Sequence, residues 1–181
     1  MSRYRWFSLN AGASNWLWLT MFVLVLDQYT KYLITARFEE FERLVVTPMF
    51  EIMRLHNEGA AFSFLSDASG WQRWVFTALG VGVSIGILIW LRRLAPRGQH
   101  LLAAGLALVM GGALGNVVDR VLWGYVVDFI RVHYEDWYFP AFNVADSAIT
   151  CGAALLIFDN ILEYGRAKSA AADKRTTPPK V

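Results

Sequence analysis

Two aspartates, Asp128 and Asp146, stand in apolar stretches of the sequence where a charged side chain is costly. Asp128 lies between Val127 and Phe129, and Asp146 lies about one turn inside an apolar helical stretch. An aspartate at the centre of a bilayer costs about 2.5–3.5 kcal/mol, so its presence there marks a functional site by default. Neither carboxyl group has an obvious counter-ion, and we expect the two to share one site.

A pair of neighbouring carboxyl groups supports one particular kind of chemistry. Two close carboxylates do not both ionise, so one stays protonated while the other is charged. The charged group can take a proton from water, and the protonated group can polarise a scissile carbonyl. The predicted reaction is peptide hydrolysis, with neither a metal nor a covalent intermediate.

Further polar residues are predicted at the same depth as this pair. They are Asp27, Lys31, Asn57, Asn116, Asp119, Arg120 and Asn143. Spacings of three or four residues place several of them on shared helix faces. Simple ion pairs such as Asp27–Lys31 or Asp119–Arg120 would explain part of this set, and Asn143 would also serve as a helix cap. Asp119 stays open as a catalytic partner, although the adjacent Arg120 favours its permanent ionisation.

Other reaction classes lack the residues they need. The three histidines are isolated and no His-Glu-x-x-His motif occurs, which argues against zinc. No Gly-x-Ser-x-Gly motif, P-loop or dinucleotide fingerprint is present. We therefore expect no cofactor and no nucleic-acid partner. A small transporter or proton pathway is the alternative function, but it requires polar residues through the whole membrane depth. A structural subunit that docks a partner is a third.

Composition and apolar runs predict an all-α polytopic membrane protein. Of 181 residues, 56% are hydrophobic and 18% are charged, which lies outside the range of soluble domains. Four runs are long enough to cross a bilayer at about 1.5 Å per helical residue. They are residues 16–34, 71–91, 101–118 and 142–158. The first is read as a retained helix, since no cleavage site for a signal peptide follows it. Small-residue spacing at Gly82/Gly86 and Gly111/Gly115 predicts close helix packing.

Outside the spans we expect a small extracytoplasmic β-sheet. Residues 49–56 and 125–132 have the β-branched and aromatic content of strands. Residues 59–65 are apolar but too short to span, and are predicted to lie along the membrane surface as an interfacial segment. The expected organisation is a cytoplasmic N-terminus at residues 1–15, one four-helix membrane peptidase domain at residues 16–164, and a disordered cytoplasmic tail at residues 165–181.

The distribution of basic residues predicts the orientation. Ten of the 17 lysines and arginines fall in the N-terminus, the loop after the second span and the tail. The positive-inside rule then places both termini in the cytoplasm and the polar cluster at the outer face.

Four blocks of sequence resemble one known family. They are NEGAAF at 57–62, GGALGNVVDR at 111–120, VVDF at 126–129 and FNVADS at 142–147. Their order and spacing resemble those of bacterial lipoprotein signal peptidase (signal peptidase II), and the resemblance covers roughly residues 16–162.

This resemblance implies a more specific set of expectations. The protein would be a monomeric aspartic endopeptidase of the bacterial cytoplasmic (inner) membrane, cleaving prolipoproteins just before a diacylglyceryl-modified cysteine. Asp128 and Asp146 would be catalytic, Asp119 would position Arg120, and the apolar segment at 59–65 would act as a lid. Membrane lipid would be a partner, and globomycin-type cyclic peptides would inhibit. The substrate-binding and supporting residues would be Asn57, Gly59, Asn116, Asp119, Arg120, Asn143, Asp27 and Lys31.

Overall fold

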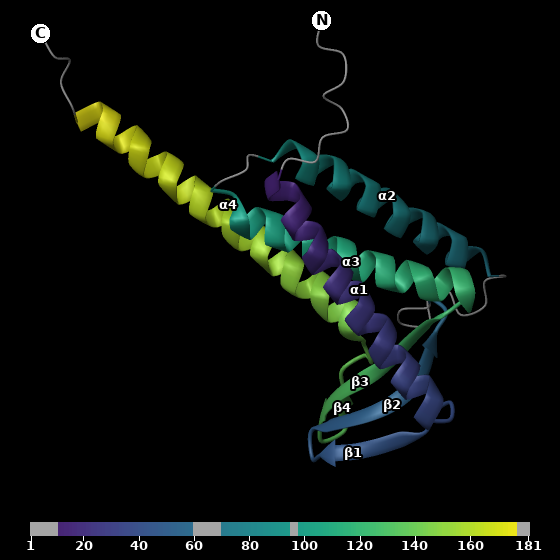
Figure 1. Cartoon of the computed structure of the whole chain (residues 1–181). Helices are drawn as coiled ribbons and strands as arrows, with labels where there is room; N and C mark the ends of the chain where they lie inside the picture. Colours follow the sequence, from purple (N-terminus) through teal and green to yellow (C-terminus); the bar gives the residue numbers. More distant parts are fainter. Residues whose placement is uncertain (1–10, 60–69, 95–97, 177–181) are drawn as a thin grey trace, which may run out of the picture.

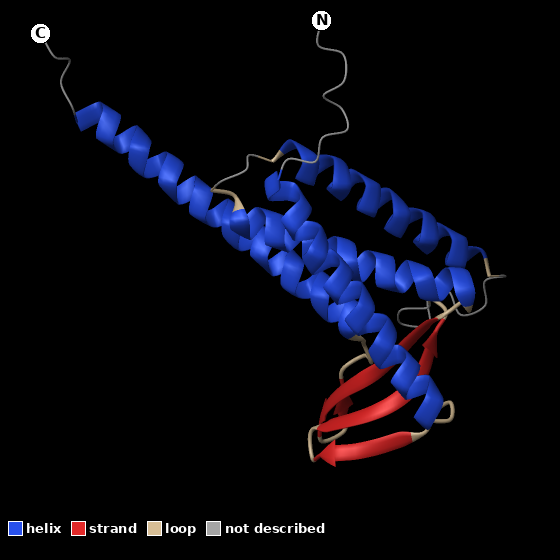
Figure 2. Cartoon of the chain, in the orientation of Figure 1, coloured by secondary structure: helices blue, strands red, loops and turns tan. Residues whose placement is uncertain are grey.

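The computed structural model describes residues 11–59, 70–94 and 98–176. Four helices form a bundle, and a small sheet lies beyond one end of it (Figures 1 and 2). Part of the predicted surface segment at 59–65 lies outside the described residues, because only Gly59 is described. The same is true of residues 1–10 at the N-terminus.

The helices account for most of the described chain. They are α1 (Ala11–Arg37), α2 (Trp71–Arg93), α3 (His100–Leu122) and α4 (Val144–Thr176). In Figure 1, α1 and α3 run towards the sheet, whereas α2 and α4 run away from it. Three of the four, α2, α3 and the Val144–Ser169 part of α4, are long and apolar enough to cross a membrane. The second half of α1 is more polar because it carries Asp27, Gln28 and Lys31.

The outer surface of the bundle is apolar, as a membrane protein requires. Large side chains such as Trp18, Phe22, Ile85, Trp90 and Ile157 are each more than 50% exposed. In water this would be a severe aggregation hazard, but in hydrocarbon it is the favourable arrangement. The protein is therefore a multi-pass membrane protein, with α3 as its most buried helix.

Glycines on α3 let the neighbouring helices approach closely. A Cβ at Gly115 would lie 2.5 Å from the Asp27 carboxylate of α1, and a Cβ at Gly111 would lie 2.8 Å from Val23. The predicted packing role of Gly111 and Gly115 is confirmed. That of Gly82 and Gly86 on α2 is wrong, because nothing lies within 4 Å of a Cβ at either position.

The sheet has four antiparallel strands in the order β1-β2-β3-β4. They are β1 (Arg43–Thr47), β2 (Phe50–Asn57), β3 (Val126–Tyr134) and β4 (Trp137–Tyr138). The two predicted strands correspond to the central pair, β2 and β3, whereas β1 and β4 were not predicted. Strand β3 packs on the end of α1 through Val127, Phe129 and Ile34. This contact fixes the position of the sheet relative to the bundle.

The last helix extends further than the sequence predicted. The structure continues α4 as a helix to Thr176, whereas the tail at 165–181 was expected to be disordered. Three consecutive alanines at 170–172 have the highest intrinsic helix propensity and explain the extension. Residues 177–181 lie outside the described chain.

Candidate active site

Asp128 is buried in β3 beside the last residue of β2. Its side chain is 3% exposed, and it is paired in the sheet with Leu55. Each carboxylate oxygen accepts a hydrogen bond from an asparagine amide. Asn57 Nδ2 lies 2.9 Å from Oδ2, and Asn143 Nδ2 lies 2.8 Å from Oδ1. The Asn57 amide is itself oriented, because its Oδ1 accepts the Gly59 backbone N–H at 2.9 Å.

Asp146 is held by the cap at the start of α4. Asn143 is the N-cap residue, and its Oδ1 accepts the Asp146 backbone N–H at 2.9 Å. In return, Asp146 Oδ2 accepts the Asn143 backbone N–H at 3.3 Å. This reciprocal arrangement is a capping box. Asn143 therefore caps the helix, as the simpler interpretation predicted, and also bridges the two aspartates.

The third amide, Asn116 on α3, connects Asp146 to a group of buried charges. Its Nδ2 donates to Asp146 Oδ1 at 2.8 Å, and its Oδ1 accepts from Lys31 Nζ at 3.0 Å. Because an amide oxygen accepts and an amide nitrogen donates, the Lys31 contact fixes which end of Asn116 faces Asp146.

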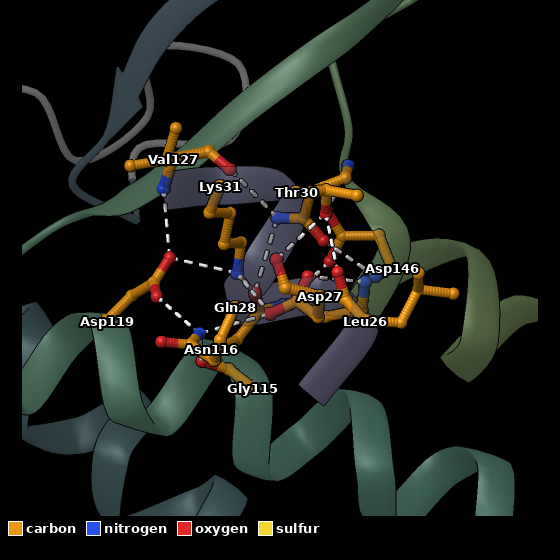
Figure 3. Close-up of polar contacts among 12 residues, drawn as sticks. Leu26, Asp27, Gln28, Thr30, Lys31, Gly115, Asn116, Asp119, Val127 and Asp146 are labelled. Carbon is orange, nitrogen blue, oxygen red and sulfur yellow. Dashed lines mark hydrogen bonds and ion pairs between the residues drawn. The ribbon is translucent and has the colours of Figure 1, made fainter. Parts of the chain in front are cut away.

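We call Asp27, Lys31 and Asp119 the charged cluster (Figure 3). Lys31 Nζ lies 2.8 Å from Asp27 Oδ2 and 2.9 Å from Asp119 Oδ2. Each carboxylate also accepts a backbone N–H, that of Ala145 for Asp27 and that of Val127 for Asp119. The charged cluster thus ties α1 to α3, α4 and β3 at one point.

Among the described residues, no direct ion pair joins Asp119 to Arg120. Asp119 pairs with Lys31 instead, because consecutive helix residues do not face each other. The Arg120 guanidinium stacks over the Phe76 ring at 5.2 Å and donates only a long hydrogen bond, 3.4 Å, to its own helix. Its Nε is buried without a partner among the described residues.

Two further residues, Gly59 and Gln28, support the site. Only Gly59 was predicted from the sequence. Gly59 adopts a φ of 98°, and a Cβ there would lie 2.9 Å from the Phe76 ring, so only glycine fits. Gln28 was not predicted. Its amide donates to Asp119 Oδ1 at 2.8 Å and to Asp27 Oδ2 at 3.2 Å. Its position next to Asp27 was the available signal.

Burial changes the acidity of Asp128. Removal of its carboxyl group from water raises the pKa to about 7; hydrogen bonds from Asn57 and Asn143 and the Lys31 charge oppose this rise, and the neighbouring Asp146 charge adds to it. Near neutral pH, Asp128 therefore exchanges a proton readily, which is the property of a general acid or base. Within the described ranges no group of three or more His, Cys, Asp or Glu side chains could hold a metal ion.

The helices and the small sheet form the fold of a polytopic membrane protein. A family model described as signal peptidase (SPase) II matches residues 19–162. The chain therefore belongs to the signal peptidase II family.

The individual relatives agree with this family. The lipoprotein signal peptidases of Pseudomonas fluorescens (strain Pf0-1) and Pseudomonas aeruginosa (strain PAO1) are each 52% identical over 150 residues, covering 82% of this chain and 88% of theirs. That of Janthinobacterium sp. (strain Marseille) is 46% identical over 165 residues, covering 91% and 99%. A solved bacterial membrane enzyme, determined by the in meso method at 1.9 Å, matches with a TM-score of 0.70 and 32% identity, covering 80% of this chain and 91% of that one.

Proposed function

We propose that this protein removes the signal peptide from diacylglyceryl-modified prolipoproteins, cleaving just before the lipidated cysteine, with Asp128 and Asp146 as the catalytic pair. The family supports the substrate class. The observation that carries the catalytic assignment is the environment of the pair. Both carboxylates are held by amide donors, and neither has an ion-pair partner within 4.0 Å among the described residues.

The raised pKa of Asp128 supports a different role for each aspartate. Asp128 carries the proton at the start of the cycle and donates a hydrogen bond to the scissile carbonyl oxygen. Asp146 takes a proton from water, whose oxygen attacks the carbonyl carbon. The C–N bond of the tetrahedral intermediate then breaks, and the amine of the lipidated cysteine leaves with the proton that Asp146 had taken up. The Asn57 and Asn143 amides keep Asp128 in place through these steps.

The membrane arrangement follows from the bundle. We propose that α1 is the fourth span, since its polar residues Asp27 and Lys31 face the bundle and are almost fully buried. Both termini then lie in the cytoplasm, and the site lies near the outer face of a bacterial inner membrane. Substrate enters sideways from the bilayer. Globomycin-type peptides compete for the same site. The protein acts as a monomer, because both aspartates come from one chain.

The transporter alternative is not favoured. The family match assigns a peptidase, and the polar residues gather at the sheet end of the bundle. No specific observation favours ion transport.

The test is cleavage of a diacylglyceryl-modified prolipoprotein peptide by the purified protein in detergent. Asp128→Asn and Asp146→Asn should each lower the rate by at least about a thousandfold, because each removes one proton-transfer group. Asp136→Asn, in the exposed turn after β3, is the matched control and should retain full activity. Full activity of either site variant would remove that residue from the mechanism. Substrate without the lipid should be cleaved poorly.

A further inference from the structure

A second site lies on the opposite face of β3 from Asp128. Consecutive strand residues point to opposite faces, so Phe129 faces away from Asp128, towards α1. There it borders a groove of about 560 Å³ between α1, β1 and β2. That volume lies within the range of small-ligand sites. The apolar lining comes from Leu33, Ile34, Phe38, Leu44, Ile52 and Phe129.

Two arginines, Arg37 and Arg43, also line the groove. Both are exposed, and in the described parts of the chain neither guanidinium has a hydrogen-bond or ion-pair partner. The other basic side chains at the sheet end all have one. These are Lys31, Arg54, Arg73, Arg120 and Arg131. Glu42 also borders the groove, but its carboxylate accepts the Glu39 backbone N–H at 2.8 Å.

The groove is continuous with the lipid-facing surface of α1. Residues 26, 33 and 37 lie on one face of the helix by its period of 3.6, and Leu26 is 38% exposed. Thr30 lies on the same face, but its hydroxyl donates to the carbonyls of Leu26 and Asp27 at 2.9 and 2.8 Å. The Thr30 hydroxyl is therefore satisfied within the helix, and its methyl group is available to contact an acyl chain. Such a chain along α1 would meet no unsatisfied polar group from Thr30.

The length of α1 is consistent with Arg37 at the depth of the phospholipid headgroups. Arg37 follows Trp16 by 21 residues in α1, which places it about 31 Å further along the helix at 1.5 Å per residue. This distance matches the thickness of the hydrocarbon layer, about 30 Å. A guanidinium at this level can bind a phosphate with two parallel hydrogen bonds.

We propose that the groove binds one anionic phospholipid from the leaflet on the sheet side. Its phosphate lies between Arg37 and Arg43, and one acyl chain runs past Leu33 towards Leu26. The diacylglyceryl group of a substrate does not fit this role, because it carries no charge to pair with the arginines. The lipid anchors the β1–β2 hairpin and the outer end of α1 to the bilayer.

Native mass spectrometry of the full chain in detergent tests this, with titration of phosphatidylglycerol and, separately, zwitterionic phosphatidylcholine. We expect one phosphatidylglycerol to bind at least about tenfold more tightly than phosphatidylcholine. Both lipids carry a phosphate, but the choline ammonium of phosphatidylcholine offsets that charge and is repelled by the two arginines. Arg37→Gln/Arg43→Gln should remove that preference. Glu42→Gln should strengthen phosphatidylglycerol binding, because a negative charge leaves the groove.

Leu44→Trp tests the groove itself, since it fills the space but keeps both arginines. It should weaken binding of both lipids, and inorganic phosphate at millimolar concentration should not compete. Equal binding of the two lipids, or no effect of Leu44→Trp and Glu42→Gln, would overturn the site. Effective competition by phosphate would reduce it to a simple anion site. The Glu42 and Leu44 variants keep the test decisive if the arginine variant folds poorly.

This site is independent of the proposed peptidase activity. Asp146→Asn, expected to be inactive, should bind phosphatidylglycerol as the unmodified protein does. Loss of lipid selectivity with intact cleavage, or the reverse, therefore separates the two proposals.

Discussion

The charged cluster and the Asp128/Asp146 pair lie at the same end of the bundle. Each contains two aspartates, but the two sets differ in the groups that contact their carboxylates. In the charged cluster, Lys31 lies within 3 Å of both Asp27 and Asp119. In the pair, amides take the place of a cation. Burial without a direct ion pair raises the pKa of Asp128 to about 7. A direct ion pair therefore distinguishes the two aspartates of the charged cluster from the two proposed catalytic aspartates.

Asn116 joins the two regions. Its carbonyl oxygen accepts from Lys31 and its amide nitrogen donates to Asp146. The charged cluster thus orients a donor for the pair without placing a charge directly on it. Substitutions in the charged cluster should mainly change the stability of the fold. Substitutions around the Asp128/Asp146 pair should mainly change the pKa of Asp128.

The largest effect on stability is expected from removal of the cation. Lys31→Met leaves Asp27 and Asp119 buried with no compensating charge, and breaking such a pair costs about 3–5 kcal/mol. Thermal unfolding in detergent should show a large drop in midpoint. Lys168→Met, on an exposed part of α4, is the matched control and should show none.

A second substitution tests whether the uncompensated charges cause the loss of stability. Asp27→Asn in the Lys31→Met background removes one of the two uncompensated charges and should recover part of the loss. If Lys31→Met unfolds at the same temperature as the unmodified protein, the charged cluster is not what holds α1 to α3.

The Asp128 carboxyl group should make stability fall with rising pH. Asp128 has a pKa of about 7 in the folded protein, against about 3.9 in an unfolded chain. Between these values the folded state binds a proton that the unfolded state has released. The resulting stabilisation is complete below about pH 4 and is lost as pH rises through 7. From pH 5 to pH 8 the loss is about 2–3 kcal/mol, at 1.36 kcal/mol per unit.

Unfolding midpoints across this pH range measure the effect. Asp128→Asn should remove most of the slope, whereas Asp136→Asn should leave it unchanged. An unaltered slope in Asp128→Asn would mean that another group titrates near neutral pH.

The sequence was sufficient to place the pair but not its surroundings. Asp128 and Asp146 were identified because a carboxylate in an apolar stretch is costly, and that argument needs no coordinates. The partner of Asp119 was not predictable in the same way. Adjacency in sequence pointed to Arg120, but helix geometry turns Asp119 towards Lys31 of α1. Such pairings depend on how helices rotate against each other, which composition and spacing do not determine.

The same distinction applies to the fold. Hydrophobic runs located the helices, and β-branched content located β2 and β3. The equal spacing of Gly82/Gly86 and Gly111/Gly115 did not reveal that only the second pair lies at helix contacts. Strand β1 carries five exposed residues, so it has no alternation of buried and exposed side chains by which to recognise it. The arginine groove depends on that strand and could not be predicted.

The smallest expected effect is a change in the pKa of Asp128 when Asn57 is replaced. Asn57 donates to Asp128 Oδ2 at 2.9 Å and thereby stabilises the charged form. Asn57→Ala removes one hydrogen bond of roughly 1 kcal/mol, which corresponds to an upward pKa shift of about 0.5–1 unit. If cleavage requires protonated Asp128, activity is lost as pH rises through this pKa. The alkaline limb of the pH–rate profile should then move from near pH 7 to higher pH. Asn160→Ala, exposed on α4, should leave the limb in place. An acidic limb near pH 7 that moves to higher pH in Asn57→Ala would instead assign the proton to Asp146, because Asp128 would then act in its charged form.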